Sequence, residues 1–175
     1  MLINLSDVMS DQHKTVEETV PFTMETIRTK YGEYRVEGSE PVHVRVEHQK
    51  NKEYLIHVEA EIAAAIPCDR CLEDVRYEFV LKFTKHVDLG LSDAELTEEL
   101  DESNFIDGYY LDVDRMLYQE ILSEWPEKVL CREDCRGLCS VCGQNLNTGT
   151  CDCEDPGLDP RMSVVRDLFK NFKEV

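Results

Sequence analysis

The chain has 175 residues, of which 42% are hydrophobic, and its 37 acidic against 19 basic side chains give a net charge of −18. This length suffices for one moderate domain with an appended module, folded without cross-links. The negative charge argues against broad binding of bare phosphate backbone, because such binding depends on Lys and Arg. No apolar run approaches the roughly 20 residues of a membrane span.

The first residues, Met1–Asp7, contain no basic segment and no sustained apolar run. They therefore do not resemble a secretion signal, which has both features. The chain also carries eight cysteines. Without secretory features, clustered cysteines are more often metal ligands than disulfide partners. We therefore expect a cytoplasmic protein.

Apolar and polar residues alternate over much of the first half of the chain. The alternation covers residues 42–46 and, after a polar turn, residues 56–66 and 75–83. A period of two predicts strands with one buried and one solvated face, as in antiparallel sheets. A further strand is expected at 20–24, at a sheet edge because Pro21 lacks an N–H for pairing.

Two of these strands, at about 54–66 and 73–85, are predicted to pair as a hairpin with Cys68 and Cys71 at its tip. The predicted fold class is α+β. In this arrangement residues 1–87 form an antiparallel sheet, either open or curled toward a barrel, and two helices and a cysteine-rich zinc knuckle follow.

An acidic segment, residues 88–111, is expected to link the sheet to the second half of the chain. Between Lys85 and Arg115 there are ten acidic residues and no Lys or Arg. Such a run usually forms a solvated loop or a short helix. The alternative is a docking surface for a cationic partner, for which ribosomal proteins are the obvious candidates.

Residues 112–175 are predicted to contain two helices that flank a cysteine-rich knuckle at 131–153. The first helix is capped by Asp112 and ends at Pro126, and the second begins at Asp159-Pro160. The predicted apolar faces consist of Val113, Met116, Leu117 and Ile121 in the first helix and of Met162, Val165, Phe169 and Phe172 in the second.

The second helix also carries three cations, Arg166, Lys170 and Lys173, at positions i, i+4 and i+7. Cations near the C-terminal end of a helix interact favourably with its dipole, which is the simpler interpretation. A contact with RNA or with a protein partner is the alternative. These three residues are therefore the candidate partner-binding residues.

The eight cysteines fall into four close pairs. The pairs are Cys68/Cys71, Cys131/Cys135, Cys139/Cys142 and Cys151/Cys153. Two thiolates on a tight turn form half of a tetrahedral zinc site, so four pairs suffice for two closed structural sites. Gly143 suits such a turn, because glycine readily adopts a positive φ.

Chain economy favours one site from the last two pairs and a second site that joins Cys68 and Cys71 to Cys131 and Cys135. A site that joins Cys68 and Cys71 to Cys139 and Cys142 is geometrically as reasonable, so the grouping stays open. Zinc is the expected metal, as two structural ions. An iron–sulfur protein or a thiol redox protein is the alternative interpretation.

The sequence predicts a protein that is not an enzyme. Its five histidines are scattered, and none is paired in sequence with a nucleophile. The chain lacks a phosphate-binding glycine loop and the Glu–His pattern of hydrolytic zinc sites. Zinc held by four thiolates leaves no position open for water, so no catalytic residue is assigned.

Three segments together resemble a known family. The string Pro67-Cys-Asp-Arg-Cys-Leu-Glu73 precedes an acidic stretch and a helix, Leu130-Cys-Arg-Glu-Asp-Cys-Arg-Gly-Leu-Cys begins the cysteine-rich segment, and Cys151-Asp-Cys153 closes it. This arrangement resembles the YceD family of large ribosomal RNA subunit accumulation proteins.

The resemblance implies a role in the accumulation or processing of 23S ribosomal RNA, and hence in large-subunit assembly. The expected partner is a ribosomal protein or a pre-ribosomal particle, since the charge favours a protein contact and makes RNA contact indirect. Direct sequence-specific RNA binding is a further alternative. No membrane association is expected.

Overall fold

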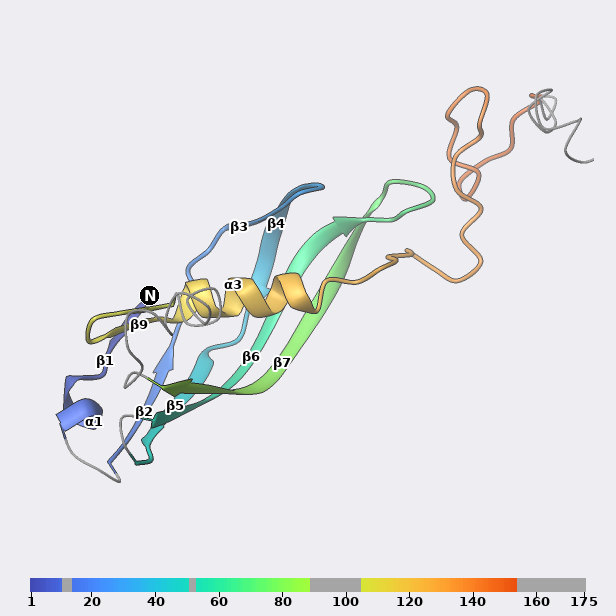
Figure 1. Cartoon of the computed structure of the whole chain (residues 1–175). Coiled ribbons are helices and arrows are strands. Elements are labelled where there is room, and N and C mark those ends of the chain that lie inside the picture. Colours follow the sequence, from blue (N-terminus) through green and yellow to red (C-terminus); the bar gives the residue numbers. More distant parts are fainter. Residues whose placement is uncertain (11–13, 51–52, 89–104, 154–175) are drawn as a thin grey trace, which may run out of the picture. The chain divides into compact units, whose positions relative to one another are not determined.

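The computed structural model describes residues 1–10, 14–50, 53–88 and 105–153 (Figure 1). They form two compact units. The first, here called the β unit, consists of Met1–Ile66 and Asp74–Val129. The second, the cysteine unit, consists of Pro67–Glu73 and the described residues from Leu130 onward. Each unit is described by itself below.

A six-stranded antiparallel sheet is the main element of the β unit. Its strands are β2 (Thr15–Val20), β3 (Thr26–Thr29), β4 (Gly32–Ser39), β5 (Val42–His48), β6 (Glu53–Pro67) and β7 (Asp74–Asp88). The order is β2-β5-β6-β4-β3, and β7 pairs with β6. Because β6 is 15 residues long, β5 pairs with Tyr54–Glu59 and β4 pairs further along it, with Ile62–Ala64.

The alternation of the sequence explains which face of this sheet is buried. Val44 pairs with Val58 and Val46 with Ile56, and all four side chains are at most 1% exposed. In β7 the residues on one face of the strand point to the core, and Phe79 is one of them. The prediction of an α+β fold with an antiparallel sheet and the β6–β7 hairpin is confirmed. The sheet is open, and no closed barrel forms within the described residues.

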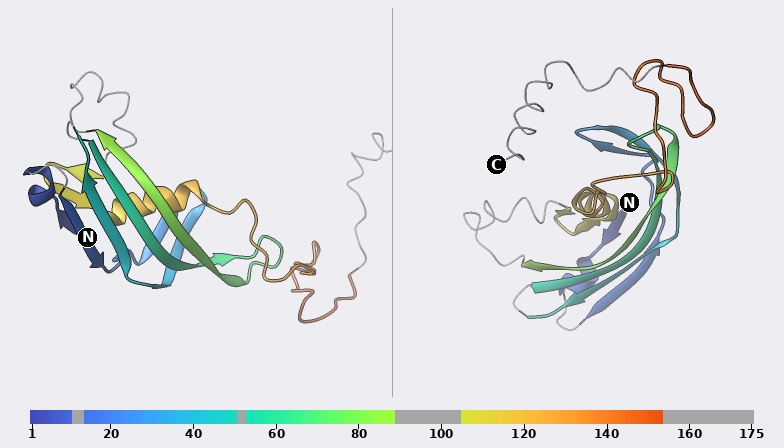
Figure 2. Two further views of the ribbon diagram at one scale, coloured as in Figure 1. Left: turned by 90° about the horizontal axis from the view of Figure 1, so that it is seen from below. Right: turned by 90° about the vertical axis from the view of Figure 1, so that its right-hand side faces the viewer.

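Helix α3 (Val113–Ser123) is the first of the two predicted helices. The side chain of Asp112 caps it as expected, by accepting the backbone N–H of Arg115 at 3.2 Å. Met116, Leu117 and Ile121 are fully buried, and Figure 2 shows the sheet curved with α3 on its inner side. The predicted second helix, with Arg166, Lys170 and Lys173, lies outside the described residues.

Several elements were not predicted. A three-stranded sheet in the order β1-β9-β8 joins both ends of the β unit, and a short helix lies near its start. The bounds are β1 (Leu2–Asn4), α1 (Ser6–Ser10), β8 (Ile106–Asp107) and β9 (Tyr110–Asp112). Thus residues 106–112, which overlap the expected acidic linker, form the β8–β9 hairpin, and residues 89–104 lie outside the described part.

The strand expected at 20–24 was placed too late in the chain. The observed strand β2 ends at Val20, directly before Pro21. Proline cannot donate to a ladder, so pairing stops there and Phe22 packs in the core outside any strand. The strand is nevertheless an edge strand, as the proline indicated.

The buried carboxylate of Asp114 links α3 to the N-terminus and to the segment that follows β2. Asp114 is 8% exposed and accepts hydrogen bonds from the α-amino group of Met1 at 2.6 Å, from the Thr23 N–H at 3.1 Å and from the Thr23 hydroxyl. Burial raises the pKa of this carboxyl, but the bonds and charge of the α-amino group and the bonds from Thr23 outweigh it and lower the pKa below its usual value.

Asp114→Asn is therefore expected to destabilise the β unit by about 1–3 kcal/mol at neutral pH, because a buried charged bond is lost. A lowered folded-state pKa stabilises above the unfolded-state pKa and ceases to do so as pH falls through the folded-state value. The difference from wild type in urea unfolding should thus shrink between about pH 5 and pH 2. The exposed Asp107→Asn serves as the control, and an equal effect there would contradict the assignment.

Candidate metal centres

The loop between β6 and β7 presents the first cysteine pair. The backbone N–H of Cys68 donates to the carbonyl of Glu73 at 2.8 Å, and that of Leu72 donates to the carbonyl of Cys68 at 2.9 Å. Leu72 adopts a positive φ of 60°, an uncommon conformation for a leucine. These bonds close a tight turn that holds the Cys68 and Cys71 side chains, which are 0% and 4% exposed.

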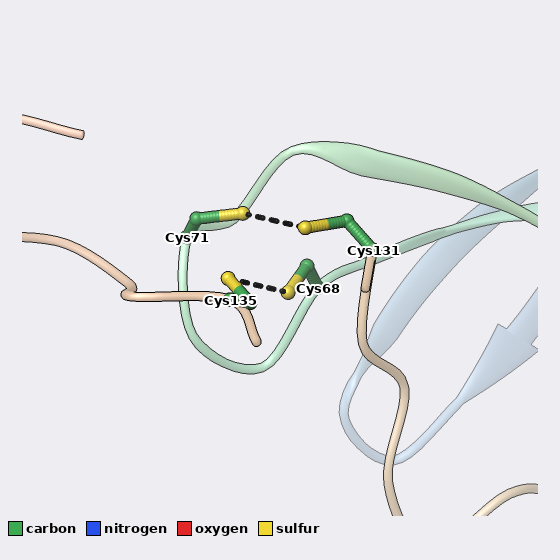
Figure 3. Close-up of side chains that lie close together, drawn as sticks. All are labelled: Cys68, Cys71, Cys131 and Cys135. Atoms are coloured by element: carbon green, nitrogen blue, oxygen red, sulfur yellow. Dashed lines mark hydrogen bonds between the residues drawn. The ribbon is translucent and has the colours of Figure 1, made fainter. Parts of the chain in front are cut away.

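Four sulfur atoms meet at this loop. Those of Cys68, Cys71, Cys131 and Cys135 all lie within 4.8 Å of one another. The Cys68 and Cys135 sulfurs are 3.8 Å apart and the Cys71 and Cys131 sulfurs 3.5 Å apart (Figure 3). A tetrahedral zinc ion with bonds of about 2.3 Å separates its sulfur ligands by about 3.8 Å. The first cluster therefore fits a tetrahedrally coordinated metal.

The pKa values of the thiols in this cluster also favour a bound metal. Burial raises the pKa of Cys68, but backbone hydrogen bonds around its sulfur, from Arg70 first, outweigh it and bring the pKa to about 6. Burial, with the neighbouring thiols, raises the pKa of Cys131 to about 12. Four adjacent thiols cannot all become thiolates without a compensating cation. A bound divalent metal supplies that charge and displaces the protons.

The second cluster is formed by Cys139, Cys142, Cys151 and Cys153, whose sulfurs also lie within 4.8 Å of one another. Backbone N–H groups of Cys142 and Val141 lower the pKa of Cys139 to about 6. Cys142 and Cys153 are exposed to solvent. Both groups of four match the grouping that chain economy favoured, and joining Cys68 and Cys71 to Cys139 and Cys142 is not what the structure shows.

A short loop between the ligands of the second cluster reaches the first. The side-chain amide of Asn147 donates to the Cys135 sulfur at 3.2 Å, and its oxygen accepts the N–H of Arg136 at 2.8 Å. The same amide is the main cause of a lowered Cys135 pKa. Asn145 donates to the Glu73 carboxylate at 2.9 Å. Sequence reasoning missed both asparagines, and their position between two cysteine pairs was the available signal.

Asn147→Ala is expected to weaken metal binding at the first cluster about 10- to 100-fold, because outer-shell hydrogen bonds orient metal ligands. Competition of the loaded protein with a zinc chelator measures this affinity. Thr148→Ala is the matched control, since among the described residues its hydroxyl bonds only to the carbonyl of Asn145, at 3.1 Å. Equal losses in both variants would show that Asn147 acts through the loop and not through the sulfur.

Comparison with known proteins agrees with the cysteine pattern. The family described as "Large ribosomal RNA subunit accumulation protein YceD" matches residues 56–169, more than half of the chain. The chain belongs to the YceD family. The matched region includes all eight cysteines and hence both clusters.

Curated relatives of this YceD family member carry no assigned activity. Uncharacterized proteins of Mycobacterium bovis and Mycobacterium tuberculosis are each 30% identical over 107 residues, which is 58% of this chain. The aligned region spans 49% of each relative, about half of its length. No solved structure matches the chain. Among the described residues no helix is both long and apolar enough to cross a membrane.

Proposed function

We propose that this protein is a non-enzymatic assembly factor that supports accumulation of 23S ribosomal RNA in the large ribosomal subunit, in the cytoplasm. The observation that carries the proposal is the pair of Cys₄ clusters within a region that matches the YceD family. The family description concerns ribosomal RNA accumulation, and the clusters supply a scaffold rather than a reaction centre.

The donor chemistry supports binding over catalysis. Each cluster offers four thiols, and the sulfur separations of the first suit a tetrahedral ion. An ion held by four thiolates has no free position at which to activate water. The two ions are proposed to be zinc. Elemental analysis should find about two zinc ions per chain, and visible absorption from an iron–sulfur cluster would overturn this choice of metal.

The charge supports a basic protein as partner. A chain with a net charge of −18 attracts cationic ribosomal proteins and is repelled by exposed phosphate. The acidic stretch 88–114 is the proposed docking segment, within a pre-ribosomal particle. Arg166, Lys170 and Lys173 remain candidate partner-binding residues by their sequence positions alone.

Depletion of the protein from its own cells tests the proposal. The ratio of 23S to small-subunit ribosomal RNA is expected to fall, and expression of the wild-type chain should restore it. Purification of a tagged chain should recover ribosomal proteins of the large subunit. An unchanged ratio in depleted cells, with no ribosomal component recovered, would refute the function.

A further inference from the structure

A pocket in the β unit is separate from both cysteine clusters. It has a volume of about 490 Å³ and lies between the β3–β4 hairpin and the C-terminal part of α3. Its lining residues are Arg28, Thr29, Lys30, Tyr31, Tyr118, Leu122 and Trp125. A volume of this size falls in the range of small-ligand sites. Nothing in the proposed assembly role uses this pocket.

The charge of the pocket is opposite to that of the chain. Among the described residues that line it, two are cations and none is acidic, whereas acidic residues outnumber basic ones almost two to one in the sequence. The Arg28 guanidinium pairs with Glu33 at 2.5 Å, just outside the lining. Lys30 forms no ion pair within the described residues, so its ammonium is the cation most available to an anionic ligand.

The aromatic rings of the pocket are held in place by the fold. Trp125 packs against Tyr34 and Phe79, with ring centroids 4.7 and 5.6 Å away. The Tyr118 hydroxyl donates to the backbone carbonyl of Arg28 at 2.5 Å. Trp125 and Tyr118 are thus oriented before any ligand arrives, which lowers the entropic cost of binding.

The hairpin turn supplies the exposed part of the site. Thr29 pairs with Gly32, which leaves Lys30 and Tyr31 as the two turn residues. Tyr31 is 73% exposed, and the Lys30 ammonium lies 4.9 Å from the centre of its ring. A large aromatic ring and a cation are thus presented together at the mouth of the pocket.

We propose that this pocket binds a nucleotide of single-stranded RNA. The base stacks on the Tyr31 and Trp125 rings, and the phosphate contacts the Lys30 ammonium, because Arg28 is already paired with Glu33. Single-stranded RNA is recognised by this combination of aromatic stacking and cationic contact to the backbone. A basic peptide would be repelled by the Lys30 ammonium. The inference deepens the proposed function, on which its cellular meaning rests, by placing a local RNA contact on an otherwise repulsive surface.

Trp125 provides the measurement, because it is the only tryptophan in the chain. Titration of the zinc-loaded chain of 175 residues with a short single-stranded oligonucleotide of uridine or adenosine should change its fluorescence saturably. Tyr31→Ala should weaken binding about tenfold, the effect of one lost base stack. Lys30→Gln should weaken binding and lower the salt dependence by about one phosphate contact. Both positions are on an exposed turn, so folding should be unaffected.

Matched controls are Tyr109→Ala, an exposed tyrosine in the turn between β8 and β9, and Lys82→Gln, an exposed lysine on β7. Neither should change the affinity. Equal binding of double-stranded RNA would overturn the proposal, because paired bases cannot stack on the rings. Binding of uridine or adenosine monophosphate as tightly as of the oligonucleotide would identify a free nucleotide as the ligand and overturn the RNA assignment.

Three further outcomes separate this inference from the proposed function. If RNA causes no fluorescence change while depleted cells still lose 23S RNA, only the pocket assignment is wrong. If a basic ribosomal-protein peptide binds in a Tyr31-dependent manner and RNA does not, the pocket is a protein site. RNA binding that requires Tyr31, in a chain whose depletion leaves 23S RNA unchanged, would refute the assembly role and keep the pocket.

Discussion

Replacing Cys68 and Cys71 together by serine is expected to lower the metal content from about two ions per chain to about one. Structural zinc contributes about 10–16 kcal/mol of apparent binding free energy in small zinc domains, and in such domains that energy is folding energy. Loss of the first ion should therefore abolish hydrogen-exchange protection in Pro67–Glu73 and in residues 130–138. The sheet and α3 belong to the β unit and should keep their protection.

The matched variant replaces Cys151 and Cys153 by serine. It removes two ligands of the second cluster, of which Cys153 is exposed, so loss of protection should be greatest at about residues 139–153. A smaller loss is expected at the first cluster, because Asn147 in this loop donates to the Cys135 sulfur. Elemental analysis and hydrogen exchange on the same samples measure both effects. If the Cys151/Cys153 variant loosens Pro67–Glu73 as strongly as the Cys68/Cys71 variant does, the two clusters do not load independently and the assignment of separate sites is wrong.

Gly137→Ala should have the second-largest effect, on stability of the cysteine unit and on metal affinity. Gly137 has a φ of 77°, and an added Cβ would lie 2.9 Å from the carbonyl oxygen of Arg70. That same oxygen accepts the N–H of Leu138 at 3.1 Å. The substitution therefore strains the backbone and separates two segments that supply metal ligands. We expect a cost of about 2–4 kcal/mol.

Gly143→Ala separates strain from steric overlap. Gly143 has a similar φ of 74°, but no atom of the described residues lies within 4 Å of its Cβ position. Its cost should be about 1–2 kcal/mol, from the left-handed conformation alone. Chelator competition and thermal unfolding of both variants give the comparison. Equal costs at the two positions would mean that the approach of Arg70 to Gly137 does not stabilise the first cluster.

The strands that the sequence predicted best are those with the strongest alternation. Residues 42–46, 56–66 and 75–83 form β5, β6 and β7, because each buries one face in a single core. The hairpin β3–β4 was missed for the opposite reason. In these two strands Ile27 is the only fully buried residue, and the alternation in β4 is between half-buried and exposed residues, so the apolar signal of each strand is short.

The short strands β1, β8 and β9 could not be predicted from local pattern. They have two or three residues each, and β1 pairs with β9 across more than 100 positions of the chain, as between Leu2 and Asp112. The β8–β9 hairpin is local, but it contains only two residue pairs. Asp114 and Thr23 likewise meet only after folding. Such contacts depend on how distant segments pack, which no periodicity encodes.

The alternation of apolar and polar residues and the spacing of the cysteines by themselves determined that this chain carries two four-thiol groups on a small α+β scaffold. They did so because alternation and ligand spacing are local properties of the sequence. Only the tertiary structure decided which pairs share a cluster, that Asn147 bonds to a ligand sulfur, and that Lys30, Tyr31 and Trp125 line one pocket. These features join side chains that are remote in sequence, and packing alone brings them together.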